Sequence, residues 1–226
     1  MLSLAGRTAS PARQPVPVRS GGFGGAAGLA RYLVSERIGA LIDATHPYAS
    51  VISDNAVAAT RQLGVPSLVL RRAPWIAIAG DRWTEVADVR DAVRALGELP
   101  RRVFVALGRK ELAPFNEAAQ HFYLIRSVDP LDPPPPLPHV AYVTGRGPFS
   151  EASDRALMTE QRIEVVVAKN SGGNATYGKI AAARALQIGV IMLRRPPAPA
   201  APNVETVEDA LGWLDHALTL ATARRV

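Results

Sequence analysis

The sequence predicts an α/β protein whose sheets are parallel. Short apolar runs of strand length alternate with segments of helical periodicity along almost the whole chain. Parallel neighbours need a crossover segment, normally a helix, so this alternation is typical of parallel sheets. The alternation restarts after Pro100. We therefore expect two domains, residues 1–99 and residues 100–226, and the 48% of hydrophobic residues is enough to fill a core in each.

The first half is expected to contain strands at 2–5, 16–19, 40–43 and 65–70, and helices at about 26–37, 48–63 and 86–96. Leu29 and Leu33 give the first helix its apolar stripe, and Gly64 ends the second helix. Thr45 can cap that second helix and Pro47 suits its first turn, where a missing N–H costs nothing. The tryptophans are expected to fill the core or a domain interface.

The second half is expected to contain strands at 103–107, 122–126, 140–143, 164–168 and 189–193, and helices at about 111–119, from 150, and at 175–187. The proline run 133–136 is best explained as a stiff linker. Thr206 and Asp209 start a C-terminal amphipathic helix in the manner of a capping box. One face of that helix is apolar and is expected to be structural, through Val207, Leu211, Leu214, Leu218 and Ala221.

Composition narrows the class of protein. There is no cysteine, which excludes disulfides and thiolate metal sites and suits a cytoplasmic protein. The four histidines lack ligand spacing, so we expect no metal. No apolar run approaches the roughly 18–20 residues of a membrane span, and we expect no signal peptide. The net charge of +6 suits a polyanionic ligand, but no basic helix face or interleaved aromatic residues indicate nucleic acid.

Three strand ends in the second half share one pattern, an apolar strand followed by a glycine turn that carries a cation. Glycines let backbone N–H groups approach an anion closely, and a following helix N-terminus adds partial positive charge. A single such turn is common on any α/β surface. Three at the carboxyl ends of strands in one domain favour an anion-binding site. The three turns are Gly108-Arg109-Lys110, Gly145-Arg146-Gly147 and Lys169-Asn170-Ser171-Gly172-Gly173.

The first half carries a polar junction where the strand at 40–43 ends. Asp43, Thr45, His46 and Tyr48 bring an acid, a hydroxyl, an imidazole and a phenol to the edge where open α/β sheets bind ligands. Taken singly, the imidazole is more often a packed or capped turn residue than a catalytic one, and the acid can likewise be a simple strand-end carboxylate. Together they favour binding or proton transfer about as strongly as a structural role.

Two further features of the first half point to a nucleotide. The glycine-dense run 21–25 is not a dinucleotide fingerprint and is weak evidence by itself. Arg7, in Gly6-Arg7-Thr8, lies where a dinucleotide sheet meets a 2′-phosphate, provided that another strand precedes it.

At these motifs the chain closely resembles the precorrin-6A reductases of cobalamin biosynthesis. The matching segments follow the family's order along nearly the whole chain: 3–8, 21–25, 43–49 with 55–56, 72–75, 106–112, 145–149, and 169–173 with Lys179 and 182–184. The resemblance implies a two-domain, Rossmann-like enzyme that uses NADPH. Family members reduce one carbon–carbon double bond of a ring-contracted polycarboxylate tetrapyrrole, precorrin-6A, to give precorrin-6B, and some act on the cobalt-loaded equivalent.

With this resemblance, each group of site residues has an expected role. His46 and Tyr48 are the candidate proton donors, with water as the alternative. The cofactor-binding residues are expected to be Ser3, Gly6, Arg7, Thr8, Gly22, Gly24, Asp43, Thr45 and Pro47. The substrate carboxylates, and in part the cofactor, are expected at Arg109, Lys110, Arg146, Lys169, Ser171, Gly172 and Gly173.

One departure from the family concerns the beginning of the chain. Family members start with a strand, a Gly-Gly-Thr turn and a helix, whereas this chain opens at the strand containing Ser3. We therefore expect the first domain to lack its initial β–α unit. Either the start codon is assigned too late, which we favour because losing a central strand exposes two edges, or the product is shortened with impaired cofactor binding.

Two other functions remain open from the sequence. One is a non-catalytic protein whose basic cleft binds a tetrapyrrole or nucleic acid. The other is a different tetrapyrrole enzyme with two α/β domains, such as a cyclising synthase, which would need no NADPH.

Overall fold

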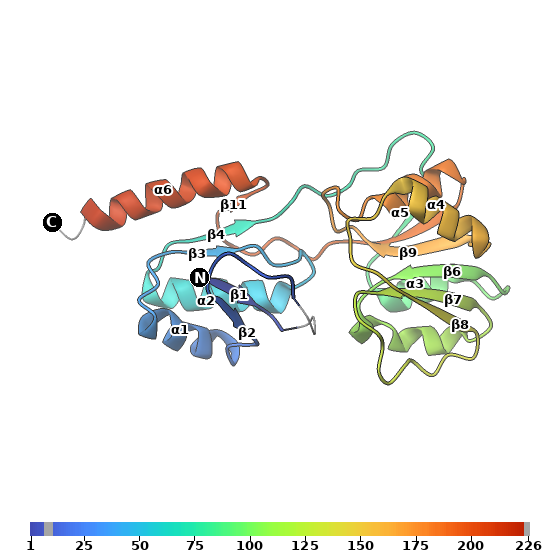
Figure 1. Cartoon of the computed structure of the whole chain (residues 1–226), viewed down its shortest axis with the longest axis horizontal. Coiled ribbons are helices and arrows are strands. Elements are labelled where there is room, and N and C mark those ends of the chain that lie inside the picture. Colours follow the sequence, from blue (N-terminus) through green and yellow to red (C-terminus); the bar gives the residue numbers. More distant parts are fainter. Residues whose placement is uncertain (7–10, 224–226) are drawn as a thin grey trace. The chain divides into compact units, whose positions relative to one another are not determined.

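The computed structural model describes residues 1–6 and 11–223 and confirms the α/β class (Figure 1). Every strand pair is parallel, and the strands form sheets of two, three and six strands. Helices follow most of the strands, as parallel connections require. None of the described helices combines the length and the apolar character that a bilayer crossing needs.

The chain divides into two compact units, and the division differs from the boundary expected at residue 99. Unit 1 comprises 1–73 and 196–226, and unit 2 comprises 74–195. Two strand pairings explain the difference. β5 (Trp83–Val86) pairs with β10 (Gly189–Leu193) in unit 2, and β11 (Asn203–Val204) pairs with β4 (Ser67–Leu70) in unit 1. Each unit therefore takes an edge strand from a distant part of the sequence.

Unit 1 holds two separate parallel sheets and three helices. β1 (Leu2–Leu4) pairs with β2 (Val18–Ser20), and β3 (Leu41–Asp43) lies beside β4 in the order β11-β4-β3. The predicted Leu29 and Leu33 stripe packs against Ala56 and Ala59, which joins two helices into a small core. Figure 1 shows these two helices on one side of the β3–β4 layer and the third on the other. The helices are α1 (Gly25–Ser35), α2 (Ser50–Leu63) and α6 (Val207–Ala223).

Unit 2 is built on one six-stranded sheet, in the order β5-β10-β9-β6-β7-β8. Its central strands are apolar and buried on both faces, as parallel strands between helices must be. From β6 the chain continues to β7 and β8 on one side of the sheet, and from β9 it continues to β10 on the other side. β6 and β9 therefore flank the topological switch point of the sheet. The remaining strands and helices are β6 (Arg102–Ala106), β7 (Phe122–Ser127), β8 (Val140–Thr144), β9 (Val165–Lys169), α3 (Val89–Leu96), α4 (Glu151–Glu160) and α5 (Gly178–Ala185).

Several local predictions need correction. The segment expected to begin a helix at 86 starts instead with β5, because pairing with β10 overrides its helical pattern. The helix expected at 111–119 is two 3-10 helices, η1 (Arg109–Glu111) and η2 (Ala113–Ala118), with a proline in the second. α2 begins at Ser50 with Ala49 at the N-cap, so Thr45 does not cap it and Pro47 precedes it.

The C-terminal helix begins as predicted, since the Asp209 N–H donates to the Thr206 hydroxyl at 3.1 Å. Its predicted apolar face is not the buried one. Val207, Leu211 and Leu218 are exposed and Leu214 is half-buried, whereas the side chain of Ala221 lies outside the described residues. Among the side chains described in this helix, the buried ones are Ala210 and Ala217. Small side chains let a helix backbone approach its neighbour closely, which explains why the alanine face packs inward.

His121 is a fully buried histidine in unit 2, between η2 and β7. Its Nδ1 accepts the Arg101 backbone N–H at 3.2 Å, and its ring packs edge-on against Tyr123 at 6.0 Å between centroids. Burial lowers the pKa of His121 below its usual 6.5. A hydrogen bond to the Gly97 backbone opposes this shift, and the nearby Arg101 charge adds to it. The native state therefore favours the neutral ring, while the unfolded chain takes up a proton near pH 6.5.

We expect the free energy of unfolding to fall as the pH drops through 6.5, because protonation breaks the bond at Nδ1 and places a charge in the core. Urea denaturation at about pH 7.5 and about pH 5.5 measures this. His121→Asn keeps an acceptor but does not titrate, so its pH dependence should be flatter. His139→Asn at an exposed position is the control and should retain the dependence. Equal slopes for His121→Asn and the parent chain would contradict the assignment.

Candidate functional site

Asp43 ends β3 in unit 1 and is 6% exposed. Its Oδ1 accepts the Thr45 backbone N–H at 2.9 Å, which forms a tight Asx turn as the chain leaves the strand. The other oxygen, Oδ2, is buried and has no hydrogen-bond partner in the protein. Buried carboxylate oxygens normally have donors, so this atom is suited to a ligand that brings an O–H or N–H group.

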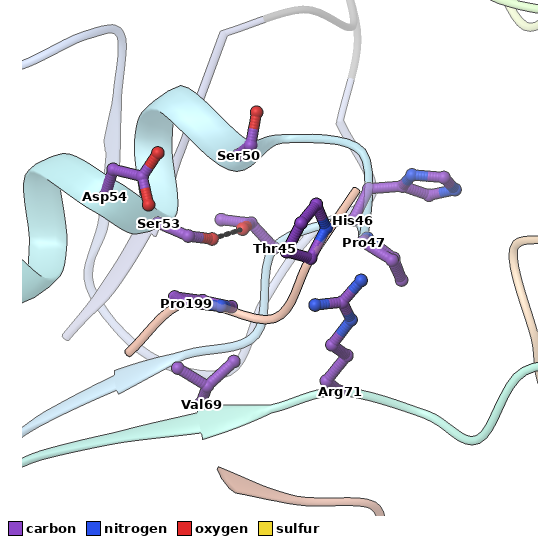
Figure 2. A pocket seen from close by; sticks show the side chains of 10 residues that line it. Thr45, His46, Pro47, Ser50, Ser53, Asp54, Val69, Arg71 and Pro199 are labelled. Carbon is purple, nitrogen blue, oxygen red and sulfur yellow. Dashed lines mark hydrogen bonds between the residues drawn. The ribbon is translucent and has the colours of Figure 1, made fainter. Parts of the chain in front are cut away.

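A hollow opens beside this turn, between the carboxyl ends of β3 and β4 (Figure 2). Three of the predicted residues, Thr45, His46 and Pro47, contribute to its wall. The Thr45 and Ser53 hydroxyls lie 3.3 Å apart and join the turn to α2. Figure 2 shows the Arg71 guanidinium reaching from the end of β4 toward the turn. The hollow therefore combines hydroxyls, the Arg71 cation, the Asp54 carboxylate and small apolar surfaces. Its remaining lining residues are Ser50, Val69, Pro197 and Pro199.

His46 and Tyr48 lie side by side in the same turn. Their rings are 5.5 Å apart, and the Tyr48 backbone N–H donates to His46 Nδ1 at 3.3 Å. A neutral imidazole that accepts at Nδ1 carries its proton on Nε2. Figure 2 shows the His46 ring directed away from the hollow, and His46 is exposed. The pair thus presents an N–H and a phenol as possible proton donors.

The ends of β1 and β2 bring two glycine segments together. The Gly21 N–H donates to the Leu4 carbonyl at 2.9 Å, and a Cβ on Gly6 would come within 3.2 Å of the Gly21 nitrogen. Gly6 therefore has to be glycine, both for this approach and for its φ of +70°. Arg19 orders the following turn by donating to the Gly21 and Gly22 carbonyls at 2.6 and 2.7 Å.

The other predicted cofactor residues lie nearby or outside the described part of the chain. Ser3 is exposed within β1. Gly24 has a φ of +81° and is the N-cap of α1. Arg7 and Thr8 fall outside the described residues.

In unit 2 the three predicted glycine turns all follow strands of one parallel sheet, so they share its carboxyl edge. Two of them flank the switch point, because β6 is hydrogen-bonded to β9. The Lys169 ammonium at the end of β9 forms an ion pair with Glu111 after β6. Glu111 also accepts the Gly108 N–H at 2.8 Å, so one carboxylate connects both turns. This is the edge where ligands of open α/β sheets bind.

The cations on these turns differ in exposure. Arg109 and Lys110 are exposed, and Arg109 donates a long 3.5 Å bond to the Pro133 carbonyl. Arg146 is half-exposed and lies 3.9 Å from Asp129. Exposed guanidinium groups of this kind can rearrange to bind carboxylates in a bidentate manner.

The turn after β9 is shaped by two consecutive left-handed glycines, Gly172 at φ +68° and Gly173 at φ +66°. Successive N–H groups in such a turn form a concave site for an anion. The turn is anchored to Trp75. The Trp75 backbone N–H donates to the Asn170 side chain at 2.7 Å, and the Trp75 indole N–H donates to the Gly173 carbonyl at 2.8 Å.

Four residues that shape these sites were not among the predicted site residues: Arg19, Arg71, Trp75 and Asn170. Trp75 also packs in the core of unit 2, as expected for the tryptophans. Arg71 follows an apolar strand, but no glycine marks the turn there, so the glycine pattern missed it. Asn170 belongs to a predicted turn, and only the fold shows that it bonds to Trp75, 95 residues away. Arg19 carried no distinguishing signal among the other arginines of the chain.

Comparison with known proteins places this geometry in a family. The profile of precorrin-6x reductase CbiJ/CobK matches residues 1–215. A precorrin-6A reductase from a Sinorhizobium species is 52% identical over 97% of this chain and 84% of its own length. One from Rhodobacter capsulatus is 50% identical over 97% of this chain and 88% of its own length.

Solved structures agree with these relatives. A structure of CobK precorrin-6A reductase superposes with a TM-score of 0.92 at 49% identity, covering 95% of this chain and 86% of that one. The Rossmann-like architecture that the resemblance implied is thereby confirmed. The chain belongs to the precorrin-6x reductase family, CbiJ/CobK.

Proposed function

We propose that this protein reduces precorrin-6A to precorrin-6B with NADPH, as a step in cobalamin biosynthesis. The observation that carries the proposal is the family relationship, with relatives named precorrin-6A reductase at 52% and 50% identity over nearly the whole chain. The cationic turns around the switch point of unit 2 support it, because they suit a substrate rich in carboxylates.

The residues of unit 1 fit a nicotinamide dinucleotide. The unpartnered Asp43 Oδ2 suits a ribose hydroxyl or an amide N–H, since strand-end acids commonly accept such groups. The close approach of Gly6 to Gly21 leaves backbone without side chains at the end of β1. Arg7 and Thr8 are proposed to bind the adenosine 2′-phosphate, and Gly22, Gly24, Thr45 and Pro47 to line the remaining path.

The reaction adds two hydrogens across one carbon–carbon bond. When bound, NADPH supplies the hydride that adds to one carbon. The neighbouring carbon then needs a proton, and His46 Nε2–H and the Tyr48 phenol are the candidate donors in this chain, with water as the alternative. The hydrogen bond from the Tyr48 backbone N–H to His46 Nδ1 keeps the ring proton on Nε2 and fixes the orientation of the ring.

The substrate carboxylates are proposed to bind at the carboxyl edge of the unit 2 sheet. Arg109 and Lys110 after β6 and Arg146 after β8 supply exposed cations. Lys169 and the N–H groups of 171–173 supply a second anion site beside the switch point. Binding several carboxylates at fixed positions orients the macrocycle, which favours reduction of one double bond over the others.

The direct test is turnover. With precorrin-6A, the chain is expected to oxidise NADPH steadily and to form one dihydro product per NADPH consumed, followed by absorbance and mass spectrometry. Tetrapyrrole binding without NADPH oxidation would instead support the non-catalytic alternative. Conversion of a tetrapyrrole without any need for NADPH would support a cyclising enzyme.

We expect Arg7→Ala to weaken the binding of NADPH on the order of ten- to a hundredfold and the binding of NADH hardly at all. The reason is that only NADPH carries the phosphate that a guanidinium can bind through charge-assisted hydrogen bonds. Fluorescence titration with each nucleotide measures both dissociation constants. Arg13→Ala, an exposed arginine a few residues further on, is the matched control. Equal losses for the two nucleotides would refute the role of Arg7.

We expect Arg109→Ala to raise KM for precorrin-6A about tenfold and to leave kcat nearly unchanged, because a carboxylate contact made equally before and during reaction contributes only to binding. The KM of the parent chain should also rise with ionic strength more steeply than that of the variant. Arg101→Ala is the matched control, since Arg101 precedes the amino end of the same strand. A fall in kcat at constant KM would contradict this assignment.

A further inference from the structure

Lys179, in the first turn of α5, is only 4% exposed. Burying an ammonium is costly unless it has partners, so its surroundings are informative. Its Nζ donates to the Thr176 carbonyl at 2.6 Å and lies 4.9 Å from the centre of the Trp75 ring. We call the segment that follows β9 the 169–177 loop. Thr176 belongs to this loop, and Trp75 forms hydrogen bonds with it.

Trp75 holds this loop at three places. The Asn170 side chain forms two hydrogen bonds with the Trp75 backbone, at 2.7 and 2.8 Å. The Trp75 indole N–H bonds to the Gly173 carbonyl, and the Trp75 ring packs against Tyr177 at 5.6 Å. Lys179 lies over the same ring and holds the Thr176 carbonyl. Trp75 and Lys179 together form what we call the loop support.

The loop support also sets the direction of the loop's peptide dipoles. In a trans peptide the C=O and the following N–H point in opposite directions. The Gly173 carbonyl accepts the Trp75 indole N–H, so the Asn174 N–H points away from that ring. With two left-handed glycines before it, this segment would otherwise sample many conformations. Fixing it in advance lowers the entropic cost of binding an anion.

The charged side chains around Lys179 come from β7, α4, β9 and α5 itself. Arg126 on β7 and Asp154 on α4 form a buried ion pair, and both interact electrostatically with the lysine. Lys169 at the end of β9 is paired with Glu111, and Arg184 on α5 itself is paired with Asp81 and bonds to Tyr177. The sequence of β10 carries no titratable side chain.

Desolvation is the main cause that lowers the pKa of Lys179, to about 7, with Arg126 lowering it further and Asp154 opposing the shift. Near neutral pH the group is therefore divided between ammonium and amine. Only the ammonium is attracted to the ring face of Trp75.

We infer that Lys179 is a positioning residue for substrate binding: its ammonium, seated on Trp75, holds the 169–177 loop in the shape that binds a substrate carboxylate, and loss of that proton loosens the loop. The inference rests on the proposed function for the carboxylate itself. The link between Lys179, Trp75 and the loop is a property of the protein alone and can be measured without substrate.

The first experiment measures that link by fluorescence. Trp83→Phe and Trp213→Phe leave Trp75 as the single tryptophan of the chain, which has three. We expect its emission to change in one step centred near pH 7, because the adjacent amine gains or loses a proton there. Lys179→Met should abolish the step. If the double Phe background folds poorly, the difference between the parent chain and Lys179→Met gives the same readout.

The second experiment measures the consequence for binding, at saturating NADPH. We expect KM for precorrin-6A to be raised on the order of tenfold in Lys179→Met, the size of one lost charge-assisted contact, with kcat changed less than twofold. In the parent chain KM should rise between about pH 6 and about pH 8.5, and in Lys179→Met it should be constant and high. Arg155→Met, which removes an exposed positive charge from α4, is the matched control and should keep the parent profile.

The outcomes separate the two claims. A missing fluorescence step, a step that persists in Lys179→Met, or an unchanged KM profile in that variant would overturn the role of Lys179 while turnover of precorrin-6A still stood. Absence of NADPH oxidation by the parent chain, with the Trp75 step intact, would overturn the proposed function and leave the loop support in place. Methionine keeps the length and apolar stem of lysine, and Asp154 stays paired with Arg126 in the variant, so no buried charge is left unpaired and the variant is expected to fold.

Discussion

The hydrogen bonds between β6 and β9 are the constraint on which unit 2 depends. These strands are neighbours in the sheet although about 60 residues of chain, including β7 and β8, lie between them. Their pairing creates the switch point and brings two cation-bearing turns to one edge. The pairing of β6 with β9 also explains the place of Glu111, an acid within a basic region. It bonds to Gly108 on one turn and pairs with Lys169 on the other, which fixes the two turns relative to each other.

Each half of the sequence contributes one strand to a sheet of the other half, and these two pairings also position residues of the candidate sites. Because β5 joins β10, the segment that leads into it runs along unit 2 and places Trp75 under the 169–177 loop. A second tie follows at Asp81, whose carboxylate is paired with Arg184 on α5. Trp75, which precedes the first strand of unit 2, thus supports the turn that follows β9. Because β11 joins β4, the returning chain brings Pro197 and Pro199 to the wall of the hollow in unit 1.

Charge is arranged differently in the two units. In unit 1 the hollow is lined by hydroxyls with one cation, Arg71, and one carboxylate, Asp54, and the buried Asp43 beside it has an oxygen without a hydrogen-bond partner in the protein. Unit 2 has exposed cations on the turns that follow its strands and a buried ion pair between Arg126 and Asp154 in its interior, where the Arg126 guanidinium lies 3.8 Å from the centre of the Phe149 ring. The first arrangement suits a nucleotide, and the second suits a ligand with several carboxylates. The net charge of +6 suits the polyanionic ligands that we propose.

The sequence by itself determined the α/β class, the strands at Leu2, Leu41, Phe122 and Val165, and the three glycine turns with their cations, because periodicity and turn chemistry are local. It also identified the family through contiguous motifs. It did not determine the domain division, β5 or the exposed apolar face of α6. It also did not place Arg71 beside the turn after β3 or Trp75 against the turn after β9. These depend on which distant segments pair, and one hydrogen bond such as that from Trp75 to Asn170 joins residues with no shared local pattern. Only the tertiary structure decides them, since burial and partner choice are properties of the packed chain.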